Sequence, residues 1–361
     1  MRYLALFVFA IAILNVIWLS TTLVESSFLE CLLAASKTKK PAPRQQDDKT
    51  KKWLNPNPNT TQNSSSKLYF DLLVVIPAHA KNDIERRVAQ RESRQMLLQS
   101  NGSCLSCGSA RSVRVIYVVG SETNEALAEE IEKYGDIVVL EGFSQNYYKD
   151  RARKTRLSIR TAVENFDFGL LMKTDTDSFI FLDRLLPLLE QKNMFWERPE
   201  LDAANRSDGD SPNDLDGSGS LSIYAGDFSG SATAPITTAG HKWEDKIYKN
   251  VTLLSAYPRH AKGPGYFLSP DLARYIATLE EPLHISGRMY KAPSPQDLPS
   301  EDVSVGFWLF SKKYVQISLP VCLKDHGCNK ARDCILDHYV GLTEMRKRWQ
   351  RFNQTKGWCG A

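Results

Sequence analysis

The stretch that decides the fold is GLLMKTDTDSFIF, residues 169–181. An apolar run leads into Lys173 and Thr174, and Asp175 and Asp177 follow with one threonine between them. A second apolar run comes next. Continuous apolar runs of this kind are typical of strands that are buried on both faces. The stretch therefore predicts a buried strand with two carboxylates directly after its C-terminal end.

Strands and helices alternate along the chain upstream of this stretch. Runs rich in β-branched residues stand at 68–77, 113–120 and 136–142, and segments of helix-forming composition follow them at 83–99, 124–135 and 149–166. This alternation predicts an α/β fold with a mostly parallel central sheet. Ligands of such sheets bind beyond the carboxyl ends of the strands, so we expect Asp175 and Asp177 on the rim that forms the ligand site.

The N-terminal segment carries no charged side chain from residue 3 to residue 24. At a helical rise of about 1.5 Å per residue, its length matches the hydrocarbon core of a bilayer. We expect a cytoplasmic tail at 1–2, a transmembrane signal anchor at 3–24 and a lumenal stem at 25–67, with a cleavable signal peptide as the alternative. Both interpretations send residues 68–361 into the secretory pathway.

Sequons and cysteines agree with an oxidising, glycosylating compartment. Asn-x-Ser/Thr sequons stand at Asn59, Asn63, Asn101, Asn205, Asn250 and Asn353. Cys31 lies beside the uncharged segment, and the remaining cysteines are Cys104, Cys107, Cys322, Cys328, Cys334 and Cys359. We expect disulfides among this even set, whose pairing cannot be deduced from the sequence.

The two aspartates are open to several functions. A calcium EF-hand is excluded, because Phe179, Ile180 and Leu186 stand where its loop needs a ligand, a glycine and a glutamate. A solvated turn, a metal-dependent hydrolase and a metal-bridged nucleotide-sugar site stay open. Carboxylate oxygens suit Mn²⁺ or Mg²⁺, and such an ion would stabilise the charge that develops on a departing nucleoside diphosphate. The formal net charge of +4 is too small to indicate a nucleic-acid partner.

A second acidic pair, Glu301 and Asp302, opens the segment EDVSVGFWLF. The preceding Ser300 has N-cap character, so both acids are expected in the first turn of a helix. A carboxylate there could take the proton from an acceptor hydroxyl. Plain helix capping is the alternative interpretation of this pair.

Five segments then stand in a fixed order. They are ERRVAQRESR (85–94), LLMKTDTDSFIF (170–181), YPRHAKGPGYFLSPDLA (257–273), EDVSVGFWL (301–309) and DHYVGLTEM (337–345). They are similar to the ERRxxIRxTW element, the strand and DDD metal motif, the YPxYxxGxGYxLS segment, the EDVxxGxWL segment and the C-terminal histidine region of one family. Together they resemble the β1,3-galactosyltransferase and β1,3-N-acetylglucosaminyltransferase family of Golgi type II membrane enzymes, with the proteoglycan linkage-region galactosyltransferase as the most similar type. Gln90, Ser93 and Arg94 replace the family's isoleucine, threonine and tryptophan, and Thr176 replaces the middle aspartate.

This resemblance implies a GT-A-like, Rossmann-type nucleotide-sugar domain at 68–361, with residues 204–222 as a flexible insertion. It implies an inverting, metal-dependent transfer of galactose from UDP-galactose, in β1,3 linkage, onto a glycan of a glycoprotein or proteoglycan. A UDP-N-acetylglucosamine-dependent transferase and a non-catalytic glycan-binding protein on the same fold are the alternatives. The implied location is the Golgi membrane, with a single-pass type II topology and a lumenal catalytic domain.

The resemblance also implies a role for individual residues. Asp302 would be the catalytic base, and Asp177, Asp175 and His338 would hold Mn²⁺, or Mg²⁺ in its place. The residues implied to contact the nucleotide sugar are Arg87, Arg91, Lys154, Lys173 and Asp175, and those implied to contact the acceptor are Glu301, Gly265 and Tyr266. Helix stabilisation is the alternative for Arg87 and Arg91, and ordinary packing is the alternative for His338.

Overall fold

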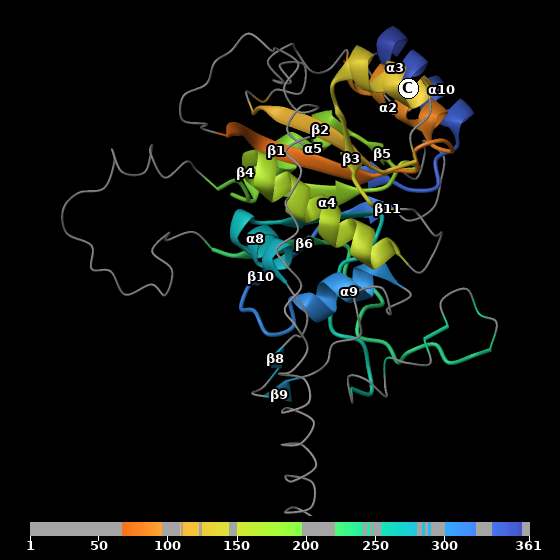
Figure 1. Cartoon of the computed structure of the whole chain (residues 1–361). Coiled ribbons are helices and arrows are strands. Elements are labelled where there is room, and N and C mark those ends of the chain that lie inside the picture. Colours follow the sequence, from red (N-terminus) through yellow and green to blue (C-terminus); the bar gives the residue numbers. More distant parts are fainter. Residues whose placement is uncertain are drawn as a thin grey trace, which may run out of the picture. The chain divides into compact units, whose positions relative to one another are not determined.

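The structure is a computed structural model, and it describes residues 67–95, 109, 111–122, 125–143, 150–196, 221–239, 241, 244–245, 248, 254–279, 284–285, 288–289, 300–322 and 334–355 (Figure 1). All of these belong to one compact unit, Lys49–Ala361. The expected anchor at 3–24, most of the stem and residues 204–220 of the expected insertion lie outside the described residues, as do the sequons other than Asn353. Within the described ranges, no helix is both long enough and apolar enough to cross a membrane.

A seven-stranded sheet forms the centre of this unit, in the order β10-β6-β7-β4-β1-β2-β3. Its strands are β1 (Leu68–Pro77), β2 (Val113–Gly120), β3 (Ile137–Leu140), β4 (Phe166–Thr174), β6 (Ile223–Gly226), β7 (Gly265–Leu268) and β10 (Val315–Ser318). Every neighbouring pair is parallel except those made by β7, which runs antiparallel to β4 and to β6. The predicted α/β fold with a mostly parallel sheet is therefore confirmed.

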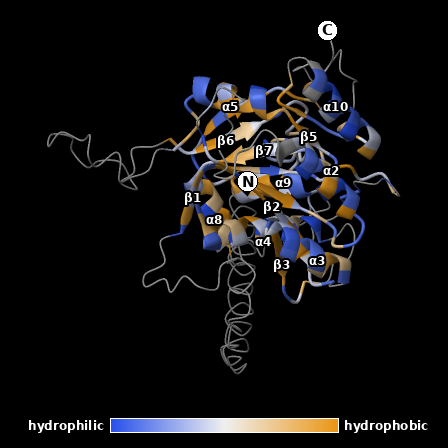
Figure 2. Cartoon of the chain, turned by 90° about the horizontal axis from the view of Figure 1, so that it is seen from above, coloured by the Kyte–Doolittle hydropathy of each residue, from blue (hydrophilic) through white to orange (hydrophobic). Residues whose placement is uncertain are grey.

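Helices cover both faces of the sheet. They are α2 (Ile84–Gln95), α3 (Glu125–Tyr134), α4 (Arg151–Asn165), α5 (Leu182–Gln191), α8 (Pro270–Thr278), α9 (Glu301–Trp308) and α10 (Leu342–Thr355). Successive side chains of a strand point to opposite faces, so Leu72 and Val74 of β1 pack with α2, α3, α5 and α10, whereas Leu73 and Val75 pack with α4, α8 and α9. Figure 2 shows the resulting pattern, with apolar strands between helices whose outer faces are polar.

A second, three-stranded sheet brings the C-terminal segment to the end of β4. It consists of β5 (Phe179–Ile180), β11 (Val321–Cys322) and β12 (Leu336–Asp337), in the order β11-β12-β5. A two-stranded antiparallel hairpin is formed separately by β8 (His284–Ile285) and β9 (Arg288–Met289). Because β12 pairs with β5, which follows the DTD segment directly, residues near 338 lie beside residues near 177.

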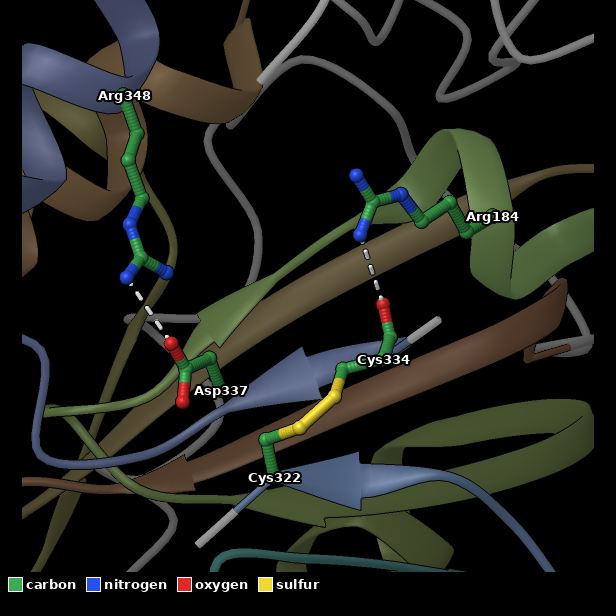
Figure 3. The surroundings of a disulfide bond; sticks show 5 residues. All are labelled: Arg184, Cys322, Cys334, Asp337 and Arg348. Atoms are coloured by element: carbon green, nitrogen blue, oxygen red, sulfur yellow. Dashed lines mark hydrogen bonds and ion pairs between the residues drawn. A yellow bond between two sulfur atoms is a disulfide. The ribbon is translucent and has the colours of Figure 1, made fainter. Parts of the chain in front are cut away.

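A disulfide and two arginines hold β12 in place (Figure 3). Cys322 of β11 is bonded to Cys334, so one pair of the expected disulfide set is identified. Arg184 of α5 donates to the carbonyl of Cys334 at 3.2 Å. A guanidinium nitrogen of Arg348 lies 2.9 Å from the carboxylate of Asp337, and both side chains are fully buried. His338, which follows Asp337, therefore stands at the end of a strand that is anchored on both sides.

Candidate metal and transfer site

The site begins where β4 ends, at the rim on which ligands of parallel sheets bind. Thr174, the last residue of β4, donates its hydroxyl to the carbonyl of Pro264 at 2.7 Å. The chain then turns, and the backbone N–H of Ser178 donates to the carbonyl of Asp175 at 3.2 Å. We call residues 175–178 the DTD loop. Asp175 and Asp177 are half-buried in it, as expected of side chains at a rim.

Three of the residues with an expected metal-binding role are brought together here. One ligand atom each of Asp175, Asp177 and His338 lies within 4.8 Å of the other two. Nδ1 of His338 is 3.3 Å from Oδ1 of Asp177 and 3.2 Å from the hydroxyl of Ser178. The backbone supports this arrangement, since the N–H of Val340 donates to the carbonyl of Asp177 at 2.9 Å. Two carboxylates and an imidazole form a donor set that fits a divalent transition-metal ion such as Mn²⁺.

Burial sets the protonation of this cluster. It lowers the pKa of His338 against the opposing effect of Asp177, which favours the neutral imidazole that a metal needs. Burial also raises the pKa of Asp177, and His338 opposes that shift. A bound cation would favour the charged form of Asp177 and would be ligated by the neutral imidazole of His338.

Lys173 links this cluster to the acidic pair on α9. Its ammonium donates to Oδ1 of Asp175 at 2.8 Å and to the carbonyl of Gly263 at 2.9 Å, and it lies 2.7 Å from Oε1 of Glu301. Burial alone would lower the pKa of Lys173, but Asp175 and Glu301 outweigh it and the pKa is raised. Burial raises the pKa of Glu301 to about 7, although Lys173 opposes the shift. Asp175, which is expected to contact the nucleotide, and Glu301, which is expected to contact the acceptor, therefore share one buried cation, the ammonium of Lys173.

Asp302 lies in the first turn of α9, as the sequence predicts. Its Oδ2 accepts from the N–H of Gly263 at 3.2 Å, and its Oδ1 accepts from the N–H of Val303 at 2.9 Å. Ser300 makes no side-chain cap bond to the helix, and its hydroxyl donates to Asp302 instead. The carboxylate of Asp302 is therefore held in one orientation at the N-terminus of α9.

Gly263 is a site residue that the sequence reasoning missed. Its N–H binds Asp302 and its carbonyl binds Lys173. A Cβ added to Gly263 would lie 2.9 Å from Oε2 of Glu301, so a side chain at this position would displace that carboxylate. The GPG sequence within the YPRHAKGPGYF segment is the signal that could have identified it.

The two residues expected to contact the acceptor from β7 are buried in the core. A Cβ at Gly265 would lie 2.9 Å from Cδ1 of Leu336, so the absence of a side chain there lets β12 pack on β7. Tyr266 is 0% exposed, and its ring centroid is 5.7 Å from the ammonium of Lys173. Their direct contact with an acceptor stays a prediction, and the structure gives both residues a packing role.

Three of the cations expected to contact the nucleotide are buried in ion pairs or backbone contacts. Arg87 binds both carboxylate oxygens of Glu130, at 2.8 and 2.6 Å, and Arg91 binds Glu130 at 2.6 Å. Arg91 also binds both carboxylate oxygens of Asp136, at 2.8 and 2.7 Å. Lys154 donates to the carbonyl of Ala78 at 2.5 Å, and burial lowers its pKa to about 8. Lys154 and Arg87, which also donates to the carbonyls of His79 and Ala80, support the loop after β1, and the nucleotide-binding role of all three residues stays a prediction.

Among the described side chains of this motif, Arg86 is the arginine that lies near the DTD loop, and the sequence reasoning did not single it out. Its Nη1 lies 3.7 Å from Oδ2 of Asp177, and its side chain is 39% exposed. Helical spacing places residue 90, four positions later, on the same side of α2 as residue 86. Gln90 does contact the backbone of the DTD loop.

Comparisons with known proteins find similarity to glycosyltransferases. A family model described as Galactosyltransferase matches residues 93–202. The chain is 26% identical over 244 residues to UDP-GalNAc:beta-1,3-N-acetylgalactosaminyltransferase 2 of Danio rerio, which covers 66% of this chain and 39% of that protein. The human protein of the same name is 30% identical over 205 residues, covering 56% of this chain and 32% of that protein. Beta-1,3-galactosyltransferase 6 of Mus musculus is 27% identical over 237 residues, covering 66% and 59%.

The chain spans less than two-thirds of the length of each of these relatives. Among solved structures, the galactosyltransferase LgtC in complex with donor and acceptor sugar analogues matches with a TM-score of 0.37 and 13% identity. That match covers 74% of this chain and 87% of the LgtC chain.

Proposed function

We propose that the chain is an inverting, metal-dependent hexosyltransferase of the β1,3-glycosyltransferase family, with a GT-A-like domain, and its similarity to members of that family supports the proposal. The observation that carries the proposal is one continuous set of contacts. Asp175, Asp177 and His338 lie together at the rim as a candidate cation site, and Lys173 and Gly263 connect them to the acidic pair of α9. A transferase needs these two ends, one for the diphosphate and one for the acceptor hydroxyl.

At the donor end, Asp177, Asp175 and His338 would hold the cation. A divalent cation bound there supplies positive charge to the diphosphate and makes it a better leaving group. Arg86 lies beside Asp177 and is partly exposed, so its guanidinium is placed to bind a phosphate oxygen. Lys173 keeps Asp175 oriented through its hydrogen bond of 2.8 Å.

At the acceptor end, the carboxylate of Asp302 would take the proton from the acceptor's 3-hydroxyl. The oxygen of that hydroxyl attacks the anomeric carbon of the donor sugar, the bond from this carbon to the β-phosphate oxygen breaks, and UDP leaves. The site offers a base and needs no enzyme nucleophile, so a single displacement converts an α-linked donor into a β-linked product. The bonds from Gly263 and Val303 hold the carboxylate of Asp302 in place for this step.

The donor that we propose is UDP-galactose, and the proposed acceptor is a glycan of a glycoprotein or proteoglycan. UDP-N-acetylgalactosamine is a second candidate donor, because two of the relatives are named for its transfer. We also propose a Golgi membrane location with single-pass type II topology. The uncharged segment at 3–24 and the Cys322–Cys334 disulfide, which suits an oxidising lumen, support this part of the proposal.

The test uses the full chain purified in a mild detergent. UDP release is measured with UDP-galactose, UDP-N-acetylgalactosamine and UDP-N-acetylglucosamine, with and without Mn²⁺, on acceptors ending in xylose, galactose or N-acetylglucosamine. We expect acceptor-dependent release that needs Mn²⁺ and is lost in Asp302→Asn. Asp271→Asn is the matched control, because Asp271 also lies in a first helical turn and accepts from a serine two residues upstream.

Each result of this test has a definite meaning. Equal release by wild type and Asp302→Asn would remove Asp302 as the base. Binding of UDP without release in either protein would favour the non-catalytic glycan-binding alternative. Failure of the wild-type protein to bind UDP in the presence of Mn²⁺ would refute the proposed function as a whole.

A further inference from the structure

Helix α2 has two polar faces with different surroundings. Residues four positions apart lie on the same face of a helix, so Arg87 and Arg91 form one pair and Arg86 and Gln90 form another. Arg87 and Arg91 are both buried against Glu130. Arg86 and Gln90 are directed toward the DTD loop, where Arg86 lies near the carboxylate of Asp177 and Gln90 lies against the backbone.

The side chain of Gln90 contacts the backbone of this loop at three carbonyls. Its side-chain nitrogen lies 3.2 Å from the carbonyl oxygen of Asp175, 3.1 Å from that of Thr176 and 3.0 Å from that of Ser178. The residue is only 4% exposed. A carboxamide nitrogen carries two hydrogens, so the three carbonyls share them. These carbonyls stand on both sides of Asp177, and one amide group therefore holds the backbone that carries both aspartates.

Among the residues that the structure describes, the N–H groups of Ser178 and Val340 also bond to carbonyls of this loop. The turn bond from Ser178 to Asp175 is 3.2 Å long, and the bond from Val340 reaches only the carbonyl of Asp177. In the family motif that this helix resembles, isoleucine stands at position 90 and aspartate at position 176, and an isoleucine side chain cannot donate a hydrogen bond. An isoleucine at position 90 would leave the carbonyls of Asp175, Thr176 and Ser178 without this donor.

We propose that Gln90 is the positioning residue of the DTD loop, and that it sets the affinity of the site for a divalent cation and for the diphosphate bound with it. This inference rests on the proposed function, because it takes the loop to be the cation and diphosphate site. Gln90 acts through the backbone and does not itself contact the substrate. Residues that orient ligands in this way typically change metal affinity by about 10- to 100-fold when they are replaced.

The test compares Gln90→Met, which keeps the length of the side chain and removes its donor, with wild type. Ser93→Ala is the matched control: Ser93 lies on the same helix, is 6% exposed, and donates to the carbonyl of Gln90 rather than to the loop. Binding of Mn²⁺ in the presence of UDP is titrated by the electron paramagnetic resonance signal of free Mn²⁺. Amide hydrogen exchange of a peptide covering residues 174–181 is measured without metal.

We expect Gln90→Met to bind Mn²⁺ at least about 10-fold more weakly than wild type. We also expect it to exchange the loop amides faster, whereas Ser93→Ala matches wild type in both assays. With saturating Mn²⁺ and donor, kcat should change far less than the donor KM. Gln90→Glu, which presents a carboxylate to the same three carbonyls, is the second variant in case Gln90→Met does not fold, and it should bind Mn²⁺ more weakly still.

Wild-type affinity and wild-type exchange in Gln90→Met would refute this inference and leave the proposed function intact. An equal loss of Mn²⁺ affinity in Ser93→Ala would also refute it, because the effect would then come from the helix and not from the contact. Failure of the wild-type protein to bind Mn²⁺ would refute the proposed function, and the role of Gln90 at a metal site with it.

Discussion

Replacing Lys173 with methionine removes the cation that joins the two ends of the site. The side chain is 3% exposed and methionine has nearly the same length, so the change leaves the packing largely intact. It deletes the contacts at 2.8 Å to Asp175, at 2.9 Å to Gly263 and at 2.7 Å to Glu301. Glu301, whose side chain is 12% exposed, then keeps a buried carboxylate without its partner. Removing one partner of a buried ion pair costs about 3–5 kcal/mol of unfolding free energy.

The stability lost in Lys173→Met depends on pH through the protonation of Glu301. The pKa of Glu301 is about 7 in the folded protein, against an ordinary value of 4.5. The folded protein therefore binds more protons than the unfolded one between these values, and stability falls as the pH rises from 4.5 to 7, by up to about 1.4 kcal/mol per pH unit. Above pH 7 this contribution is constant in wild type. Without Lys173 the pKa of Glu301 rises further, so the fall continues above pH 7.

The loss caused by Lys173→Met should therefore be larger at pH 8 than at pH 6, by about 1 kcal/mol. Urea unfolding of the full chain, followed by tryptophan fluorescence at both pH values, measures it. The double variant Lys173→Met/Glu301→Gln has no carboxylate at position 301 and should lose the extra pH dependence. A loss that is the same at pH 6 and pH 8, or that the second substitution leaves unchanged, would refute the assignment of the ion pair.

Three further predictions follow from the site. Arg87→Met should lower the free energy of unfolding in urea by about 3–5 kcal/mol, because it leaves Glu130 without one of its arginines. Arg86→Ala should change the free energy of unfolding by less than about 1 kcal/mol and raise the donor KM. The reverse order of the two stability losses would contradict the two-face interpretation of α2. Replacing Cys322 and Cys334 with serine should cost about 3 kcal/mol and weaken Mn²⁺ binding, since the N–H of His338 donates to the carbonyl of Cys322 at 3.0 Å; unchanged Mn²⁺ affinity would remove the link to the metal site. Gly263→Ala should lower kcat and cost about 1–3 kcal/mol, because its Cβ would collide with Glu301; wild-type kinetics would show that the segment can shift.

Much of the fold could be predicted from local patterns. Buried strands appear as continuous apolar runs, and the strand 166–174 ends where the apolar run of the opening stretch meets Lys173 and Thr174. The DTD loop follows directly, so its place at the rim of the sheet could be inferred without coordinates. The helix start at Glu301 was predicted from the serine before it. These features depend on neighbours in the sequence, and neighbours set backbone conformation through steric preference and capping.

Which surfaces meet could not be predicted in the same way. Helical spacing groups Arg87 with Arg91 and Arg86 with Gln90, but it does not say which pair faces the site, and the resemblance selected the pair that is buried against α3. Gly265 has no side chain, and the space is filled by Leu336, a residue 71 positions later in the sequence. Such choices depend on burial and on charge partners that come together only when distant segments pack.

The amino-acid sequence by itself determined the α/β alternation, the carboxylates at the end of β4 and the acids that open α9, because each depends on residues within a few positions of one another. The tertiary structure decided that β7 enters the sheet antiparallel, that β12 pairs with β5 and so brings His338 beside Asp177, and that Lys173 joins both acidic groups. The physical reason is that long-range pairing depends on the free energy of burying whole faces and of pairing buried charges. These contributions come from contacts between distant segments, so no local pattern in the sequence predicts them.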